Sequence, residues 1–120
     1  MSALLPDEAL VVHGGRNLEE SFRRGTGVIV DQHGKLHGVS ANSAPGLGIA
    51  ELTSANPQTR YPGIPHGQVG VTTVGAIRKA GGEVVATPTR KNQYHATLNG
   101  LTAKQLSSLF QPTQKNPRKP

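Results

Sequence analysis

The 120-residue chain has no cysteine, no tryptophan and only four aromatic residues, Phe22, Tyr61, Tyr94 and Phe110. The absence of cysteine excludes a disulfide framework, thiolate-ligated zinc, iron–sulfur centres and thiol catalysis. No stretch approaches the roughly 18 consecutive apolar residues that a transmembrane helix needs, so we expect no membrane-spanning segment. The length suits a single domain, and we expect residues 1–110 to form it around a thin, mainly aliphatic core.

Acidic residues are scarce in the second half of the chain. Residues 1–51 hold four bases and six acids, whereas residues 52–120 hold nine bases and one acid. A basic surface attracts polyanions because it neutralises phosphates and releases counterions, so nucleic acid is the first partner to consider. A solvated basic face is the plainer alternative. Residues 111–120 contain three prolines, three bases and no apolar side chain, and we predict a disordered basic tail there.

Short apolar segments alternate with glycine-containing turns along the chain. Strands are predicted where β-branched and apolar residues cluster, at 9–13, 27–31, 36–40, 83–87 and 94–98, with a further apolar segment from 69 to 71. Turns are predicted at His33-Gly34 and Asn99-Gly100, and a single helical turn at 48–53. Helices are predicted at 18–24 after Asn17, at 74–80 after Thr72 or Thr73, and to residue 110 after the capping box Thr102–Gln105. This order predicts an α+β fold, a small twisted, mostly antiparallel sheet with two or three short helices packed on one face.

His95 is the strongest candidate for a catalytic residue. Strand alternation places His95 and Thr97 on one face, opposite the apolar residues of the segment Tyr94–Leu98. Histidine exchanges protons near neutral pH, and a neighbouring hydroxyl can donate a hydrogen bond to a phosphate oxygen. Arg90 and Lys91, in the loop before this strand, can neutralise the charge that develops at a phosphate.

His66 is the natural partner of His95. It follows the long Gly- and Pro-rich segment 41–65, and the Pro and Gly beside it keep the ring accessible. Cleavage of RNA through its 2′-hydroxyl needs both a base and an acid, which two histidines supply. Arg78 and Thr89 complete the set of expected substrate contacts. The five histidines lack metal-ligand spacing and a carboxylate cluster, so we expect no metal and no cofactor.

The segment His13-Gly14-Gly15-Arg16 supports a different function. Together with Ser40–Ser43 it could form the site of an ADP-ribosyltransferase or NAD-consuming enzyme, with His13 and Arg16 at its centre. A tight turn leading into the following helix is the structural alternative. A second alternative is a non-catalytic nucleic-acid-binding module, for which the charge fits but stacking aromatics are few. The sequence assigns no role to His33 and His37.

The segment His66–Phe110, with PHGQVGVTTVGAIRKAGGEVV and then YHATLNGLTAKQLSSLF, resembles C-terminal toxin domains of bacterial contact-dependent growth inhibition and polymorphic toxin systems. It is most similar in style to small ribonuclease toxins of the barnase–EndoU–colicin–RelE type. The resemblance implies an RNA endonuclease, often specific for tRNA, that a secreted or cell-surface effector delivers into the cytoplasm of target bacteria. It also implies an acidic cognate immunity protein and, for some members, a translation factor of the target cell as a partner.

The resemblance implies acid–base roles for His95 and His66 and a phosphate contact for Thr97. Glu83 is the only acid of the basic half, which departs from a barnase-like pairing of glutamate with histidine and favours His with Thr, Arg or Lys. The predicted reaction is a metal-independent transphosphorylation that leaves a 2′,3′-cyclic phosphate and a 5′-hydroxyl.

Overall fold

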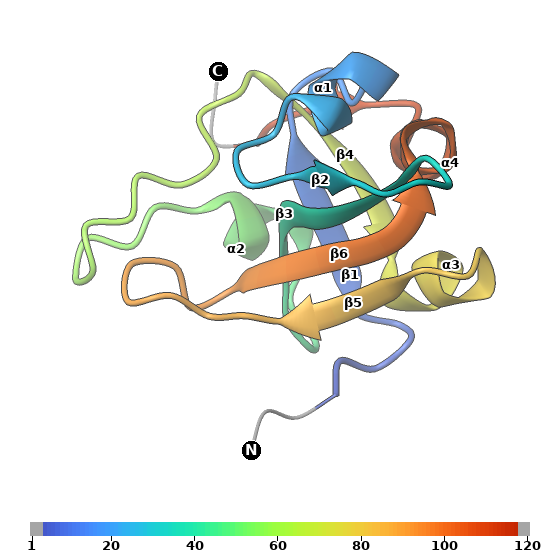
Figure 1. Cartoon of the computed structure of the whole chain (residues 1–120). Helices are drawn as coiled ribbons and strands as arrows, with labels where there is room; N and C mark the ends of the chain where they lie inside the picture. Colours follow the sequence, from blue (N-terminus) through green and yellow to red (C-terminus); the bar gives the residue numbers. More distant parts are fainter. Residues whose placement is uncertain (1–3, 118–120) are drawn as a thin grey trace.

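The computed structural model describes residues 4–117 and places seven strands in one curled antiparallel sheet (Figure 1). In chain order the strands are β1 (Leu10–Gly14), β2 (Ile29–Val30), β3 (Lys35–Ser43), β4 (Gln68–Thr73), β5 (Glu83–Ala86), β6 (His95–Thr102) and β7 (Gln114–Lys115). Their order in the sheet is β5-β6-β3-β1-β4-β7, with β2 paired to β3. The predicted α+β fold with an antiparallel sheet is confirmed.

Four short helices lie among the described residues, namely α1 (Glu19–Arg23), α2 (Ile49–Thr53), α3 (Val74–Lys79) and α4 (Ala103–Phe110). Predicted caps fix the start of two of them. The Thr73 hydroxyl accepts from the Ala76 amide at the start of α3, and the Thr102–Gln105 capping box is formed at the start of α4. Within residues 4–117 no helix has the length and apolar character needed to cross a membrane.

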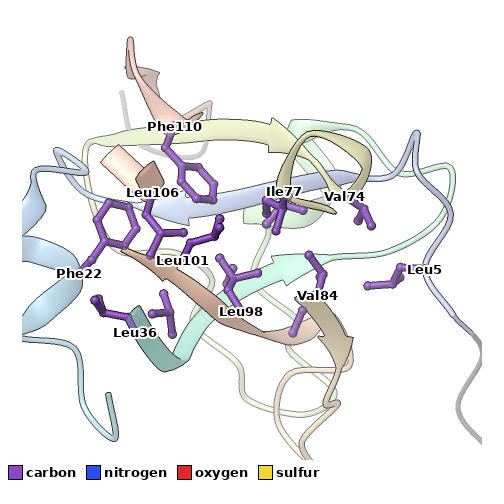
Figure 2. Close-up of a cluster of buried hydrophobic side chains, with 14 of the residues drawn as sticks. Leu5, Phe22, Leu36, Val74, Ile77, Val84, Leu98, Leu101, Leu106 and Phe110 are labelled. Atoms are coloured by element: carbon purple, nitrogen blue, oxygen red, sulfur yellow. The ribbon is translucent and has the colours of Figure 1, made fainter. Parts of the chain in front are cut away.

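Two apolar clusters cover opposite faces of the sheet, because adjacent strand residues such as Val11 and Val12 point to opposite sides. The larger cluster packs α1, α3 and α4 on one face, where Phe22, Leu106 and Phe110 come together (Figure 2). The smaller cluster packs α2 against the other face. That second face is only partly covered, which leaves room on it for polar side chains.

Asn17 does not cap α1, contrary to our prediction. The N-cap position is Leu18, without a side-chain cap, and Asn17 is buried with φ 57°. Its amide nitrogen donates to the carbonyl oxygens of His13 and Gly15 at 3.0 and 2.8 Å. These two bonds hold the turn after β1. The Asn17 side chain is therefore not available to cap the helix that follows.

The predicted hairpin is formed by β2 and β3, with Gly34 in its turn at φ 78°. Asn99-Gly100, however, lies inside β6 rather than in a turn. Asn99 pairs with Glu83 on one side and His37 on the other, and its side-chain oxygen accepts from the Gly38 amide at 2.9 Å. Because β6 pairs with β3 on one side and β5 on the other, the strand continues through Asn99-Gly100, a dipeptide that is typical of turns.

Gln114 and Lys115 form a strand of the sheet, whereas we predicted a disordered tail at 111–120. β7 pairs with β4, and Asn116 is fully buried. Residues 118–120 lie outside the described residues. The prediction of disorder, which rested on polar composition, is therefore wrong for residues 114–116. Backbone pairing with β4 and the buried Asn116 amide hold these residues in place without apolar side chains.

Candidate active site

A cleft of about 740 Å³ lies on the partly covered face of the sheet. Its walls are the end of β1, the middle of β3, the loop before β4 and the start of β6. The lining residues are Val12–Arg16, Ser21, Ser40–Asn42, Tyr61–His66, Asn92 and His95. Both predicted catalytic histidines, His66 and His95, line this one cleft.

His95 is the centre of a chain of hydrogen-bonded polar groups. Its Nδ1 lies 2.8 Å from the Thr87 hydroxyl oxygen, which in turn lies 2.8 Å from the hydroxyl oxygen of Thr97. On the other side of the ring, Nε2 lies 3.1 Å from the Ser40 hydroxyl. The predicted proximity of His95 and Thr97 is therefore indirect, because Thr87 joins them.

These contacts define how His95 holds its proton. Nδ1 also lies 3.1 Å from the Thr87 carbonyl oxygen, which can only accept, so we assign the proton of the neutral ring to Nδ1. Nε2 then accepts from the Ser40 hydroxyl. This atom lies on the exposed side of the sheet, where a substrate hydroxyl that displaced Ser40 could give it a proton.

His66 rests against Gly14, the last residue of β1, and against Gly15, which follows it. A Cβ atom added to Gly14 would overlap Nδ1 of His66 and lie 2.6 Å from the Ile64 side chain, so the approach requires glycine. The side-chain amide of the buried Asn116 donates to the carbonyl oxygens of Ile64 and His66 at 2.9 and 2.8 Å. The loop backbone is fixed while the His66 side chain remains exposed in the cleft.

His13 also lines this cleft, but its ring is partly buried against the larger core cluster. Its ring packs on Phe22 and Phe110, with centroid separations of 4.6 and 5.8 Å, and Nδ1 lies 2.8 Å from the Asn17 side-chain oxygen. The pKa of His13 is lowered to about 4, mainly by burial; the Asn17 hydrogen bond raises it by a smaller amount, and nearby His66 contributes to the lowering. This packing favours a structural role for His13 over the NAD-binding role of the alternative interpretation.

The positive charge at this cleft comes from Arg16, which is exposed and lines it. Of the cations that we expected to contact substrate, Lys91 lines a neighbouring pocket. Arg78 pairs with Asp7 at 2.6 Å and lines a separate pocket beside β5. The structure thus groups Arg16 with the histidines and places Arg78 elsewhere.

The remaining expected contacts lie in the loop before β6. The Thr89 hydroxyl accepts from the Asn92 amide at 2.9 Å, so it shapes the loop. Arg90 and Lys91 are exposed in the same loop. Neither Thr89 nor Arg90 is among the residues that line the cleft.

Tyr61 and Asn92 could not be assigned to the cleft from sequence, whereas Ser40 and Asn42 belong to the segment 40–43 that the sequence analysis grouped with His13 and Arg16. The side chains of Asn92, Asn42 and Tyr61 are bonded to one another: the buried Asn92 donates to the side-chain oxygen of the buried Asn42 at 2.8 Å, and Asn42 donates to the Tyr61 hydroxyl at 3.0 Å. Ser40 and Asn42 share a face of β3 by alternation, which is a signal that the sequence does carry. Tyr61 lies in the long loop, where no periodic pattern indicates its neighbours.

Searches against protein-family models, curated proteins and solved structures gave no match to this chain.

Proposed function

We propose that this protein is a metal-independent RNA endonuclease that cleaves by transphosphorylation, with His95 as the base and His66 as the acid. The observation that carries the proposal is that both histidines, together with Arg16, line one open cleft. Among the described residues, no Asp or Glu lines that cleft. A cleft that an arginine lines and that no acid lines among the described residues favours an anionic substrate such as a phosphodiester.

In the proposed reaction, Nε2 of His95 takes the proton of the 2′-hydroxyl while its oxygen attacks the adjacent phosphorus. The bond from phosphorus to the 5′-oxygen breaks, and His66 gives that oxygen a proton. Arg16 offsets the additional negative charge at phosphorus in the transition state. The products are a 2′,3′-cyclic phosphate and a 5′-hydroxyl. Thr97 acts through Thr87 on His95 and is also a candidate phosphate contact.

The proposal extends to partners and setting. tRNA is the first RNA to test, and an acidic immunity protein that covers Arg16 and the two histidines would inhibit the enzyme. Delivery into target bacteria by a larger effector, and presentation of tRNA by a translation factor of the target cell, belong to the same proposal. Each rests on the sequence resemblance and on the basic charge of the second half of the chain.

The test is cleavage of purified tRNA in the presence of EDTA, with analysis of the product ends. His95→Ala should abolish cleavage while circular dichroism shows an intact fold. His33→Ala is the matched control, because His33 is exposed in the β2–β3 turn and outside the cleft. A folded His95→Ala protein with full activity would refute the assignment. Tight, salt-sensitive RNA binding without cleavage by the unmodified protein would instead support a non-catalytic binding module.

A further inference from the structure

A second pocket, of about 280 Å³, adjoins the histidine cleft. Its lining residues are Glu51, Ser54–Pro57, Tyr61 and Lys91–Tyr94. Tyr61 and Asn92 line both the pocket and the cleft, so the two share a wall. Two loops meet here, and the Thr59 hydroxyl donates to the Lys91 carbonyl oxygen at 2.6 Å to join them.

The four aromatic residues of the chain fall into a buried pair and an accessible pair. Phe22 and Phe110 are fully buried in the larger core cluster. Tyr61 and Tyr94 are both half-buried and both line the second pocket. The accessible aromatic surface of the four aromatic side chains is therefore gathered beside the histidine cleft. Stacking on aromatic rings is the usual way in which proteins hold unpaired nucleobases.

The polar groups of the pocket differ from those of the cleft. Glu51 is exposed at its rim, and no hydrogen bond or ion pair within residues 4–117 engages its carboxylate. Gln93 is exposed nearby and can donate or accept. The Asn92 side chain is already used, since it donates to Asn42 and accepts from the Tyr94 amide. The exposed groups that the pocket offers to a ligand therefore include the Glu51 carboxylate, the Gln93 amide and the Lys91 ammonium group, in a pocket that two tyrosines also line.

We propose that this pocket binds a guanine base of the RNA substrate, in the nucleotide next to the scissile phosphate. The inference rests on the proposed ribonuclease function. A carboxylate accepts two hydrogen bonds side by side, and guanine is the base whose Watson–Crick edge offers two adjacent N–H donors, N1–H and the N2 amine. Gln93 can donate to the guanine O6, and Lys91 offsets the charge of Glu51 near the RNA backbone.

The pocket can be tested by binding, independently of catalysis. The chain has no tryptophan and both tyrosines line the pocket, so intrinsic tyrosine fluorescence reports on it directly. The 3′-monophosphates of guanosine, adenosine, cytidine and uridine are titrated with correction for their absorbance, and inorganic phosphate is titrated alongside. Guanosine 3′-monophosphate should bind most tightly. Equal affinity for all four nucleotides, or an equal response to inorganic phosphate, would overturn the proposal.

Glu51→Gln identifies the group that selects the base, because it keeps the size of the side chain and replaces a carboxylate oxygen by an amide. We expect it to weaken guanosine monophosphate binding about tenfold or more, with little effect on adenosine monophosphate. Glu8→Gln is the matched control, since Glu8 is exposed and outside the pocket. Unchanged guanosine binding in Glu51→Gln, or the same loss in Glu8→Gln, would contradict the assignment.

Cleavage of dinucleotides separates this inference from the function on which it rests. Substrates with guanine on the 5′ or the 3′ side of the phosphate are compared with substrates that lack guanine. Faster cleavage of one guanine series supports the inference and places the base relative to the bond. Cleavage with no base preference overturns the guanine site while the ribonuclease function stands. Selective guanosine binding with no cleavage of any RNA keeps the site and refutes the ribonuclease.

Discussion

Asn116 should hold His66 in the cleft, and its replacement gives a graded test of the site. Its side-chain nitrogen donates to the carbonyl oxygens of Ile64 and His66 at 2.9 and 2.8 Å, and its backbone amide donates to Gly67 at 2.9 Å. Asn116→Ala removes the two side-chain bonds and keeps the backbone bond. At about 0.5–1.5 kcal/mol for each bond, the expected loss of stability is about 1–3 kcal/mol.

Asn116→Asp should be worse than Asn116→Ala, because an ionised carboxylate has no donor and sets its oxygens against two carbonyl oxygens. Gln114→Ala is the control, since Gln114 lies two residues before Asn116, in β7, and is exposed. The free energy of unfolding is measured by urea denaturation, and RNA cleavage is measured on the same samples under conditions where each variant is folded. Both quantities should fall in the order Gln114→Ala, Asn116→Ala, Asn116→Asp. Wild-type stability and activity in Asn116→Asp would refute the role of this amide.

Two further predictions concern Gly14 and the partly buried His13. Gly14→Ala should displace His66 and strongly reduce RNA cleavage, whereas Gly67→Ala, where an added Cβ meets nothing within 4 Å, should not; equal activities would contradict the close approach. The pKa of His13 is lowered from 6.5 to about 4 in the folded state, so the unfolded chain binds its proton first as the pH falls. The contribution of this group to stability is complete above pH 6.5 and is lost progressively towards pH 4, by up to about 3 kcal/mol. Urea denaturation between pH 7.5 and 4.5 checks this, and a His13→Gln variant with the same pH dependence as the wild type would rule it out.

The elements that the sequence predicted best are those that local chemistry determines. The capping residues Thr73 and Thr102 act within one turn of their helices, so their side chains are sufficient to place α3 and α4. Predictions failed where another partner competes for the residue, whether it is near in the chain or distant. Asn17 is a good helix cap by residue type, but it bonds to the turn after β1, and Asn99 is held in β6 by strands on both sides.

In the candidate site, too, the features that local sequence determines were predicted and those that depend on the arrangement of the sheet were not. Alternation along β6 correctly places His95 and Thr97 on the face opposite Ala96, which is buried in the core. Sequence proximity, in contrast, did not indicate which cation accompanies them. Arg90 is only five positions from His95, yet Arg16 lines the cleft, because the β1–β3–β6 order of the sheet brings the end of β1 to that face.

The partly buried His13 affects how the exposed His66 could act as an acid. A protonated His66 beside a charged His13 would suffer repulsion between like charges at close range. Burial keeps His13 neutral at physiological pH, since its pKa is lowered to about 4. A neutral His13 can then lie close to His66 without repelling it when His66 acts as the acid of the proposed reaction. In the proposed reaction, the phenylalanine packing that holds His13 uncharged therefore also allows His66 and Arg16 to act as the cationic groups of the cleft.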